Sequence, residues 1–251
     1  MPEAEVMQPS PRHSPIHNYH HNDLLWVRVG WAMPLLLCDL DDTLVDREEA
    51  FRRWSEHFAR EHRLHLPAVL AWLVELDAHG YSSRSDLVAS IAERFGVWPD
   101  QARALAQFRH DLAMAVPEIS RDARRSLIVL RRSGWKIAIV TNGTEPQQML
   151  KLRVAGLELL VDACVVSEAV GCSKPSPAIF RYAAAACECQ MSGGWMIGDS
   201  PEADILGAAE VGLNTIWVKR GRTWPVRGVR PTLEVASVEE GLEWVLGQGF
   251  S

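Results

Sequence analysis

Short apolar runs alternate with helical patterns along most of this chain, from residue 35 onward. The apolar runs cover residues 35–38, 135–140, 163–166, 195–197 and 215–218. Runs of this kind are typical of strands that are covered on both faces. Their alternation with helices predicts β-α-β units and therefore a parallel sheet. Helices are expected to end near Gly134, Gly156 and Gly212, because glycine commonly terminates a helix.

The interval 47–116 interrupts this alternation. Apolar residues recur there at helical spacing in four stretches, around residues 51–58, 66–73, 87–95 and 99–112. Ser85 is a candidate N-cap of the third helix, and Gly96 is a candidate stop signal. We therefore predict four amphipathic helices inserted after the first strand.

The chain divides on this basis into three parts. Residues 1–32 contain prolines and histidines but no core-building periodicity, so they are expected to form a flexible tail. Residues 33–46 and 117–251 should form the α/β core, and residues 47–116 a helical cap.

Composition narrows the class of protein. Of 251 residues, 47% are hydrophobic, which is enough for a sizeable core. The 26 basic and 32 acidic side chains give a net charge of -6, so no general positive field would recruit nucleic acid or a membrane. Five cysteines without a CxxC pair indicate a reducing compartment. The apolar segment at 24–38 is too broken to span a membrane. We therefore expect a cytoplasmic protein. A homodimer is possible on the sequence alone.

Three acids follow the first predicted strand directly. Asp39, Asp41 and Asp42 stand within four residues, where a buried strand has no reason to place charge unless something cationic meets it. On an extended backbone Asp39 and Asp41 lie on one face, roughly 6.5 Å apart. That spacing lets one carboxylate attack a phosphorus atom while the other reaches the leaving oxygen.

Polar residues also follow three other predicted strands. Thr141 and Asn142 follow one, Lys174 another, and Asp199 with Asp204 a third. Ligands of parallel sheets bind outside the carboxyl ends of the strands, so these side chains should converge. An anionic carboxylate that approaches a phosphate needs positive charge nearby, which Lys174 and a metal ion can supply.

These residues resemble the four motifs of the haloacid dehalogenase-like (HAD) superfamily, in the expected order. The motifs are Asp39-Leu40-Asp41-Asp42-Thr43, Thr141-Asn142, Lys174-Pro175 and Gly198-Asp199 with Asp204. The likeness spans nearly everything from Pro34 to Val245. It implies an α/β fold with a Rossmann-like parallel sheet and an inserted helical cap, similar to the phosphoglycolate phosphatase branch.

The resemblance also implies roles for single residues. Asp39 would be the nucleophile and Asp41 the general acid and base, with its pKa raised by a nearby carboxylate so that it holds a proton. Thr141 would bind the transferring phosphoryl group, and Lys174 would neutralise charge on nucleophile and phosphate. Asn142 is a further candidate for substrate binding.

The implied cofactor is Mg²⁺, which prefers oxygen ligands. Asp39 and Asp199 would ligate it through their side chains, and Asp41 through its backbone carbonyl. Asp204 would act directly or through water, although it could equally cap the following helix. Asp42 and Asp46 are expected to stabilise or cap the turn after the strand.

The function expected from these features is Mg²⁺-dependent hydrolysis of a small phosphorylated metabolite through an aspartyl-phosphate. Dehalogenase chemistry is disfavoured, because expelling a halide needs no proton donor such as Asp41. A phosphosugar mutase, a phospho-accepting domain of the receiver type and a catalytically silent binding protein stay as alternatives. A P-loop and a GxGxxG after a strand are both absent, which argues against nucleoside triphosphate hydrolysis and dinucleotide binding.

The insertion begins just after Asp46, so we expect it to form a mobile lid that contributes selectivity. Within it, Arg52, Arg53 and Arg84 are candidates for contact with a second anionic group of the substrate.

Overall fold

The computed structural model describes residues 33–80 and 82–248, except for the side chain of residue 79. These residues belong to one compact unit. The predicted flexible tail, 1–32, lies outside the described residues. Within the described part of the chain, no helix is both long and apolar enough to cross a membrane, and all five cysteines are free thiols.

The centre of the unit is a six-stranded sheet in which each neighbouring pair of strands is parallel, in the order β3-β2-β1-β4-β5-β6. The strands are β1 (Leu35–Cys38), β2 (Lys136–Thr141), β3 (Ala163–Val166), β4 (Trp195–Gly198), β5 (Asn214–Val218) and β6 (Leu233–Val235). The five predicted strands are confirmed, with bounds shifted by at most one residue. The sequence analysis missed β6, a three-residue edge strand.

Alternate residues of each strand face opposite layers of helices, because side chains along a strand alternate between its two faces. In β1, Leu36 and Cys38 belong to one apolar cluster, and Leu35 and Leu37 to another. The first cluster contains residues of α5 (Arg121–Arg132), α6 (Glu145–Val154) and α10 (Val238–Gly247). The second contains residues of α8 (Pro177–Ala186) and α9 (Gly207–Glu210). The sheet is therefore buried on both sides, as its apolar runs predicted.

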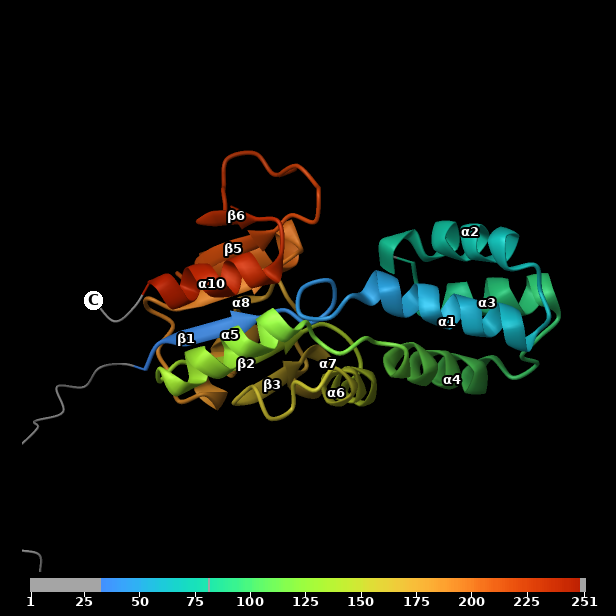
Figure 1. The fold of residues 1–251 in the computed structure, drawn as a ribbon, viewed down its shortest axis with the longest axis horizontal. Coiled ribbons are helices and arrows are strands. Elements are labelled where there is room, and N and C mark those ends of the chain that lie inside the picture. Colours follow the sequence, from blue (N-terminus) through green and yellow to red (C-terminus); the bar gives the residue numbers. More distant parts are fainter. Residues whose placement is uncertain (1–32, 81, 249–251) are drawn as a thin grey trace, which may run out of the picture. The chain divides into compact units, whose positions relative to one another are not determined.

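The insertion consists of four α-helices between β1 and α5, as predicted, and Figure 1 shows them grouped beyond the strand ends. They are α1 (Arg47–Glu61), α2 (Leu66–Asp77), α3 (Arg84–Phe95) and α4 (Gln101–Met114), with a short helix η1 (Ala78–Gly80) after α2. Aromatic rings fill the space between them, with the Trp54 and Phe108 centroids 4.7 Å apart. Whether the insertion is a separate domain stays a prediction.

Local signals place most of these helix ends. Asp46 caps α1 by accepting a hydrogen bond from the Glu49 N–H (3.0 Å), which confirms its predicted capping role. Gly96 ends α3 with φ of 64°, also as predicted. The prediction for the start of α3 is wrong: Ser83 occupies the N-cap position, because its backbone is still extended while Arg84 is already helical.

Candidate active site

The first acid of the sequence motif stands where β1 ends. The Asp39 N–H donates to the Ile197 carbonyl (2.9 Å), which fixes the end of β1 to β4. Its side chain is 8% exposed. The chain then turns back sharply: Asp42 has φ of 61°, and its N–H donates to the Val45 carbonyl at 2.8 Å. This turn carries the carboxylates of Asp39 and Asp41 into one pocket.

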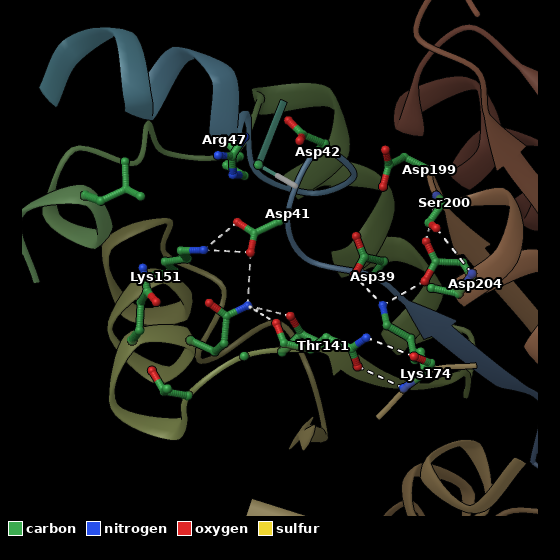
Figure 2. Close-up of a pocket in the computed structure, with 18 of the residues that line it drawn as sticks. Asp39, Asp41, Asp42, Arg47, Thr141, Lys151, Lys174, Asp199, Ser200 and Asp204 are labelled. Atoms are coloured by element: carbon green, nitrogen blue, oxygen red, sulfur yellow. Dashed lines mark hydrogen bonds and ion pairs between the residues drawn. The ribbon is translucent and has the colours of Figure 1, made fainter. Parts of the chain in front are cut away.

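Lys174 lies between two buried carboxylates. Its ammonium is 2.5 Å from Asp39 Oδ1 and 2.7 Å from Asp204 Oδ1. Dashed lines mark both contacts in Figure 2. Burial lowers the pKa of Lys174, but the two carboxylates more than compensate and hold that pKa above its ordinary value. Lys174 is therefore a charged ammonium directed at the candidate nucleophile, which is the place that its motif predicted.

Asp204 has two partners that fix its position. Its second oxygen, Oδ2, accepts a hydrogen bond from the Ser200 N–H at the start of η2 (Pro201–Leu206), at 2.9 Å. A β-carbon at Gly198 would lie 2.3 Å from that same oxygen, so only glycine at the end of β4 leaves room for this carboxylate. Asp204 lies inside η2, whose N-cap is Ser200, so the predicted capping role is wrong. Its role toward a metal ion stays a prediction.

Three carboxylates, those of Asp39, Asp199 and Asp204, form a cluster whose oxygen atoms lie within 4.8 Å of one another. Burial raises the pKa of Asp39 above its ordinary value, and the other two carboxylates raise it further although Lys174 opposes this. Burial and Asp204 also raise the pKa of Asp199, to about 6. We call these three residues the carboxylate cluster.

The carboxylate cluster fits a divalent cation. Crowded acids in a buried place are costly unless positive charge compensates them. All the donors are carboxylate oxygens, the ligand type that Mg²⁺ prefers. Two side chains of the protein compete with such a cation: Lys174 contacts Asp39 and Asp204, and Arg222 Nη2 donates to Asp199 Oδ2 at 2.9 Å.

Asp41 is held by two residues of α6 that the sequence analysis missed. The ammonium of Lys151 lies 2.7 and 2.6 Å from its two carboxylate oxygens, and Gln148 Nε2 donates to Oδ2 at 3.0 Å. Burial raises the pKa of Asp41, but Lys151 and Gln148 outweigh that effect and hold the pKa below its ordinary value. The expectation of a raised pKa is therefore contradicted, because the charge nearest to Asp41 is an ammonium.

Thr141 is the last residue of β2 and Asn142 follows it directly, and their side chains take different partners. The Thr141 hydroxyl lines the pocket and accepts a hydrogen bond from Gln148 at 2.5 Å. The Asn142 amide instead holds the backbone of Lys174, donating to its carbonyl (3.0 Å) and accepting from its N–H (2.9 Å). The Asn142 amide therefore positions the loop that carries Lys174, and because Asn142 also lines the pocket, its contact with substrate stays a prediction.

The pocket that contains these groups has a volume of about 400 Å³, and the inserted helices contribute Arg47, Arg84 and Arg109 to it. Of the arginines predicted from the sequence, only Arg84 lies there. Arg52 pairs with Glu49 and Glu56 along the exposed side of α1, so its predicted substrate contact is wrong.

Arg53 is engaged in the same way, by Glu49 at 2.7 Å. The sequence analysis missed Arg47 and Arg109, because arginines on amphipathic helices normally lie on the solvated face.

Comparisons with known proteins agree with this geometry. The family model of the haloacid dehalogenase-like hydrolases matches residues 33–212. A phosphoserine phosphatase from Thermus thermophilus is 28% identical, over 83% of this chain and 97% of its own length. A glyceraldehyde 3-phosphate phosphatase from Pyrococcus abyssi is 30% identical, over 75% of this chain and 82% of its own.

A solved structure of another HAD-hydrolase has a similar fold. The HAD-hydrolase YfnB from Bacillus subtilis, bound to magnesium, superimposes with a TM-score of 0.65 at 25% identity. The match covers 86% of this chain and 99% of that one. Fold, strand-end residues and family model coincide over the same part of the sequence, and the chain is an enzyme that belongs to the haloacid dehalogenase-like hydrolase family.

Proposed function

We propose that this hydrolase is a Mg²⁺-dependent phosphatase that acts on a small phosphomonoester through an aspartyl-phosphate on Asp39. One observation carries the proposal: a buried carboxylate at the end of β1 contacts a charged lysine, and a second acid follows two residues later in the same pocket. A nucleophile flanked by positive charge is what attack on an anionic phosphate requires.

In the first half-reaction a carboxylate oxygen of Asp39 attacks phosphorus, and the bond between phosphorus and the ester oxygen breaks. The leaving alkoxide takes a proton from Asp41, which must have bound that proton before the step because Lys151 favours its carboxylate form. Lys174 offsets the charge that Asp39 and the phosphoryl group bring together. Thr141, whose hydroxyl already accepts from Gln148, can donate its own proton to a phosphoryl oxygen.

In the second half-reaction Asp41 takes a proton from water, whose oxygen attacks phosphorus. The bond between phosphorus and Asp39 breaks, which releases inorganic phosphate and restores the carboxylate. Lys151 is suited to this stage, because it stabilises the carboxylate form of Asp41.

Asp39, Asp199 and Asp204 would hold the Mg²⁺ ion, with the backbone carbonyl of Asp41 as a further ligand. When bound, the ion supplies positive charge that reduces the repulsion between nucleophile and phosphate and stabilises charge on the phosphoryl oxygens.

The size of the pocket and the relatives support a small substrate. A cavity of about 400 Å³ is at the lower end of the range for small-molecule sites. The two relatives above are named for phosphoserine and glyceraldehyde 3-phosphate, both short phosphomonoesters.

The test is phosphate release from a panel of short phosphomonoesters with Mg²⁺, by the parent protein and by Asp39→Asn. We expect release by the parent only, and a phosphorylated peptide containing Asp39 after rapid quenching. The matched control is Asp122→Asn, an exposed carboxylate at the start of α5, which should behave as the parent.

Undiminished turnover by Asp39→Asn would overturn the proposal. Isomerised phosphosugar in place of free phosphate would identify a mutase instead.

A further inference from the structure

The inserted helices place three guanidinium groups in the pocket that contains Asp39. Arg47 is the first residue of α1, Arg84 is the first residue of α3, and Arg109 lies on α4. None of the three is needed for attack on phosphorus, for which Lys174 and a metal ion supply the positive charge. Their common location therefore needs a separate explanation.

A structural explanation accounts for only part of this arginine cluster. Arg47 Nη2 donates to both carboxylate oxygens of Asp77, at 2.7 and 2.6 Å, so that pair alone would satisfy the buried acid. Arg84 Nη1 contacts the same Asp77 at 2.5 Å. Burial and the charge of Arg47 lower the pKa of Arg84 below its ordinary value, so bringing a second arginine to this carboxylate has an electrostatic cost.

One donor of the cluster is left over. The side chain of Arg47 is only 6% exposed, and within the described residues its Nη1 has no hydrogen-bond partner. Buried polar groups without a partner are rare in native structures, because leaving one unsatisfied costs roughly 1–3 kcal/mol. A ligand that enters the pocket is a partner of the right kind.

The backbone holds this guanidinium in place. A β-carbon at Gly80 would lie 2.5 Å from the central carbon of the Arg47 guanidinium, and Gly80 has φ of 87°. Glycine therefore lets the η1 turn pack directly against Arg47. A donor held this firmly loses little conformational entropy when it binds a ligand.

The charges in this part of the pocket do not balance. Arg47 and Arg84 share one carboxylate of the inserted helices, that of Asp77, and Arg109 has no ion pair among the described residues. The remaining positive charge has no counterpart on the inserted helices that line the pocket. Guanidinium groups pair with carboxylate and phosphate oxygens through their planar set of donors.

We propose that Arg47, Arg84 and Arg109 bind a second anionic group of the substrate, a carboxylate or a second phosphate, at the end remote from the scissile ester. The substrate class is then a short phosphomonoester with two acidic ends. This inference rests on the proposed phosphatase function, and it narrows the substrate of that same site.

Three esters that differ only at the far end test it: propyl phosphate, 3-phosphooxypropanoate and propane-1,3-diyl bisphosphate. We expect kcat/KM for at least one doubly anionic ester to exceed that for propyl phosphate by about tenfold or more, which corresponds to about 1.4 kcal/mol. Whichever of the two is preferred identifies the anion as carboxylate or phosphate.

The arginine variants connect this preference to the cluster. Arg109→Ala and Arg84→Ala should each reduce the ratio of kcat/KM between the doubly anionic ester and propyl phosphate by about tenfold. Arg84→Lys should restore part of it, because the charge is kept. The matched control is Arg103→Ala, an exposed arginine of α4 outside the pocket, which should leave the ratio unchanged.

Equal kcat/KM for all three esters in the parent, or a ratio that neither variant changes, would overturn the inference. Calorimetric binding of the same esters to Asp39→Asn with Mg²⁺ separates the two proposals. Preferential binding of a doubly anionic ester, with no hydrolysis by the parent, would leave the subsite standing and refute the phosphatase. Hydrolysis of all three esters with equal kcat/KM would support the phosphatase and refute the proposed subsite for a second anionic group.

Discussion

The ion pair between Lys151 and Asp41 gives a prediction that can be worked out from its geometry. The Lys151 side chain is 5% exposed and that of Asp41 is 23% exposed, so the pair is mostly shielded from water. Lys151→Met keeps the length and apolar stem of the side chain and removes only the ammonium. The Asp41 carboxylate is then left with Gln148 as its remaining partner on α6.

The expected loss of stability follows from the two contacts that disappear. Removing one partner of a fully buried pair costs about 3–5 kcal/mol, whereas a single hydrogen bond to a charged group contributes about 1.5–3 kcal/mol. Water can reach part of the Asp41 carboxylate and replace the ammonium there. We therefore expect a loss of stability in the range of a single hydrogen bond to a charged group, about 1.5–3 kcal/mol. Lys151→Met should therefore reduce the free energy of unfolding by about 2 kcal/mol at pH 7.

A double-mutant cycle isolates the pair from other effects of the substitutions. Urea unfolding of the parent, Lys151→Met, Asp41→Asn and the double variant should give a coupling of about 1–2 kcal/mol at pH 7. The pKa of Asp41 is held below its ordinary value, so the coupling should be complete above that ordinary pKa and disappear as the pH falls through the lowered pKa.

The control is Lys219→Met, whose ammonium has no ion pair among the described residues and which should change stability little. A coupling below about 0.5 kcal/mol, which is the error of additivity between independent sites, would refute this account of Asp41.

Three further predictions concern the proposed acid, the metal and the sheet. Asp41→Asn should lower turnover of alkyl phosphates by about 10² to 10⁴-fold. Turnover of aryl phosphates should fall less, because a good leaving group needs no proton; equal losses for both substrates in steady-state assays would assign Asp41 another role. EDTA should abolish activity, and Mg²⁺ should restore it and raise the melting temperature of the parent but not of Asp199→Asn; full activity of the metal-free protein would contradict this. Asp162→Asn should cost about 1–2 kcal/mol of stability above pH 4, because burial raises the pKa of Asp162 but the Ile137 N–H and Lys136 hold it below its ordinary value. That cost should shrink as the pH falls through the lowered pKa, and urea unfolding would contradict the reasoning if the cost were the same at every pH.

The sheet could be predicted because its strands are buried on both faces and therefore apolar without interruption. In β1 all four residues are buried, and the motif acids start immediately after it. β6 could not be found in the same way. Of its three residues only Val235 is buried, since an edge strand is covered on fewer sides.

The convergence of Asp39, Lys174 and Asp199 could also be predicted, because parallel strands place their carboxyl ends at one edge of the sheet. Lys151 and Gln148 could not, since each reads as an ordinary surface residue of a helix. One signal was available: they stand three residues apart, on the same face of the helix that follows Thr141. Only the folded chain shows that this face meets Asp41, which is 110 residues distant from Lys151.

Asn142 shows a different limit of sequence reasoning. Its position at the end of β2 was predicted correctly, but an amide can hold either a ligand or a neighbouring loop. Both ends of this amide bond the backbone of Lys174, 32 residues away. A motif thus identifies where a residue lies more reliably than which partner its side chain takes.

The short turn between Asp41 and α1 connects the reaction centre with the proposed specificity site. The Leu44 and Val45 N–H groups both donate to the Leu40 carbonyl, at 3.0 and 2.9 Å, and Asp46 caps the helix that Arg47 begins. Arg47 is therefore fixed relative to Asp41 by a few bonded residues, whatever the later inserted helices do.

Arg84 and Arg109 are placed differently, because they stand on α3 and α4 and reach the pocket only through the packing of the insertion. Asp77 joins Arg84 to Arg47, but within the described part of the chain Arg109 forms no ion pair. If the insertion moves as a lid, Arg109 should change its distance from Asp41 more than Arg47 does. The length of the substrate would then have to match the distance between Asp41 and an Arg109 side chain that reaches the pocket only when the lid closes. Discrimination among doubly anionic esters of different length should therefore depend on Arg109 more than on Arg47.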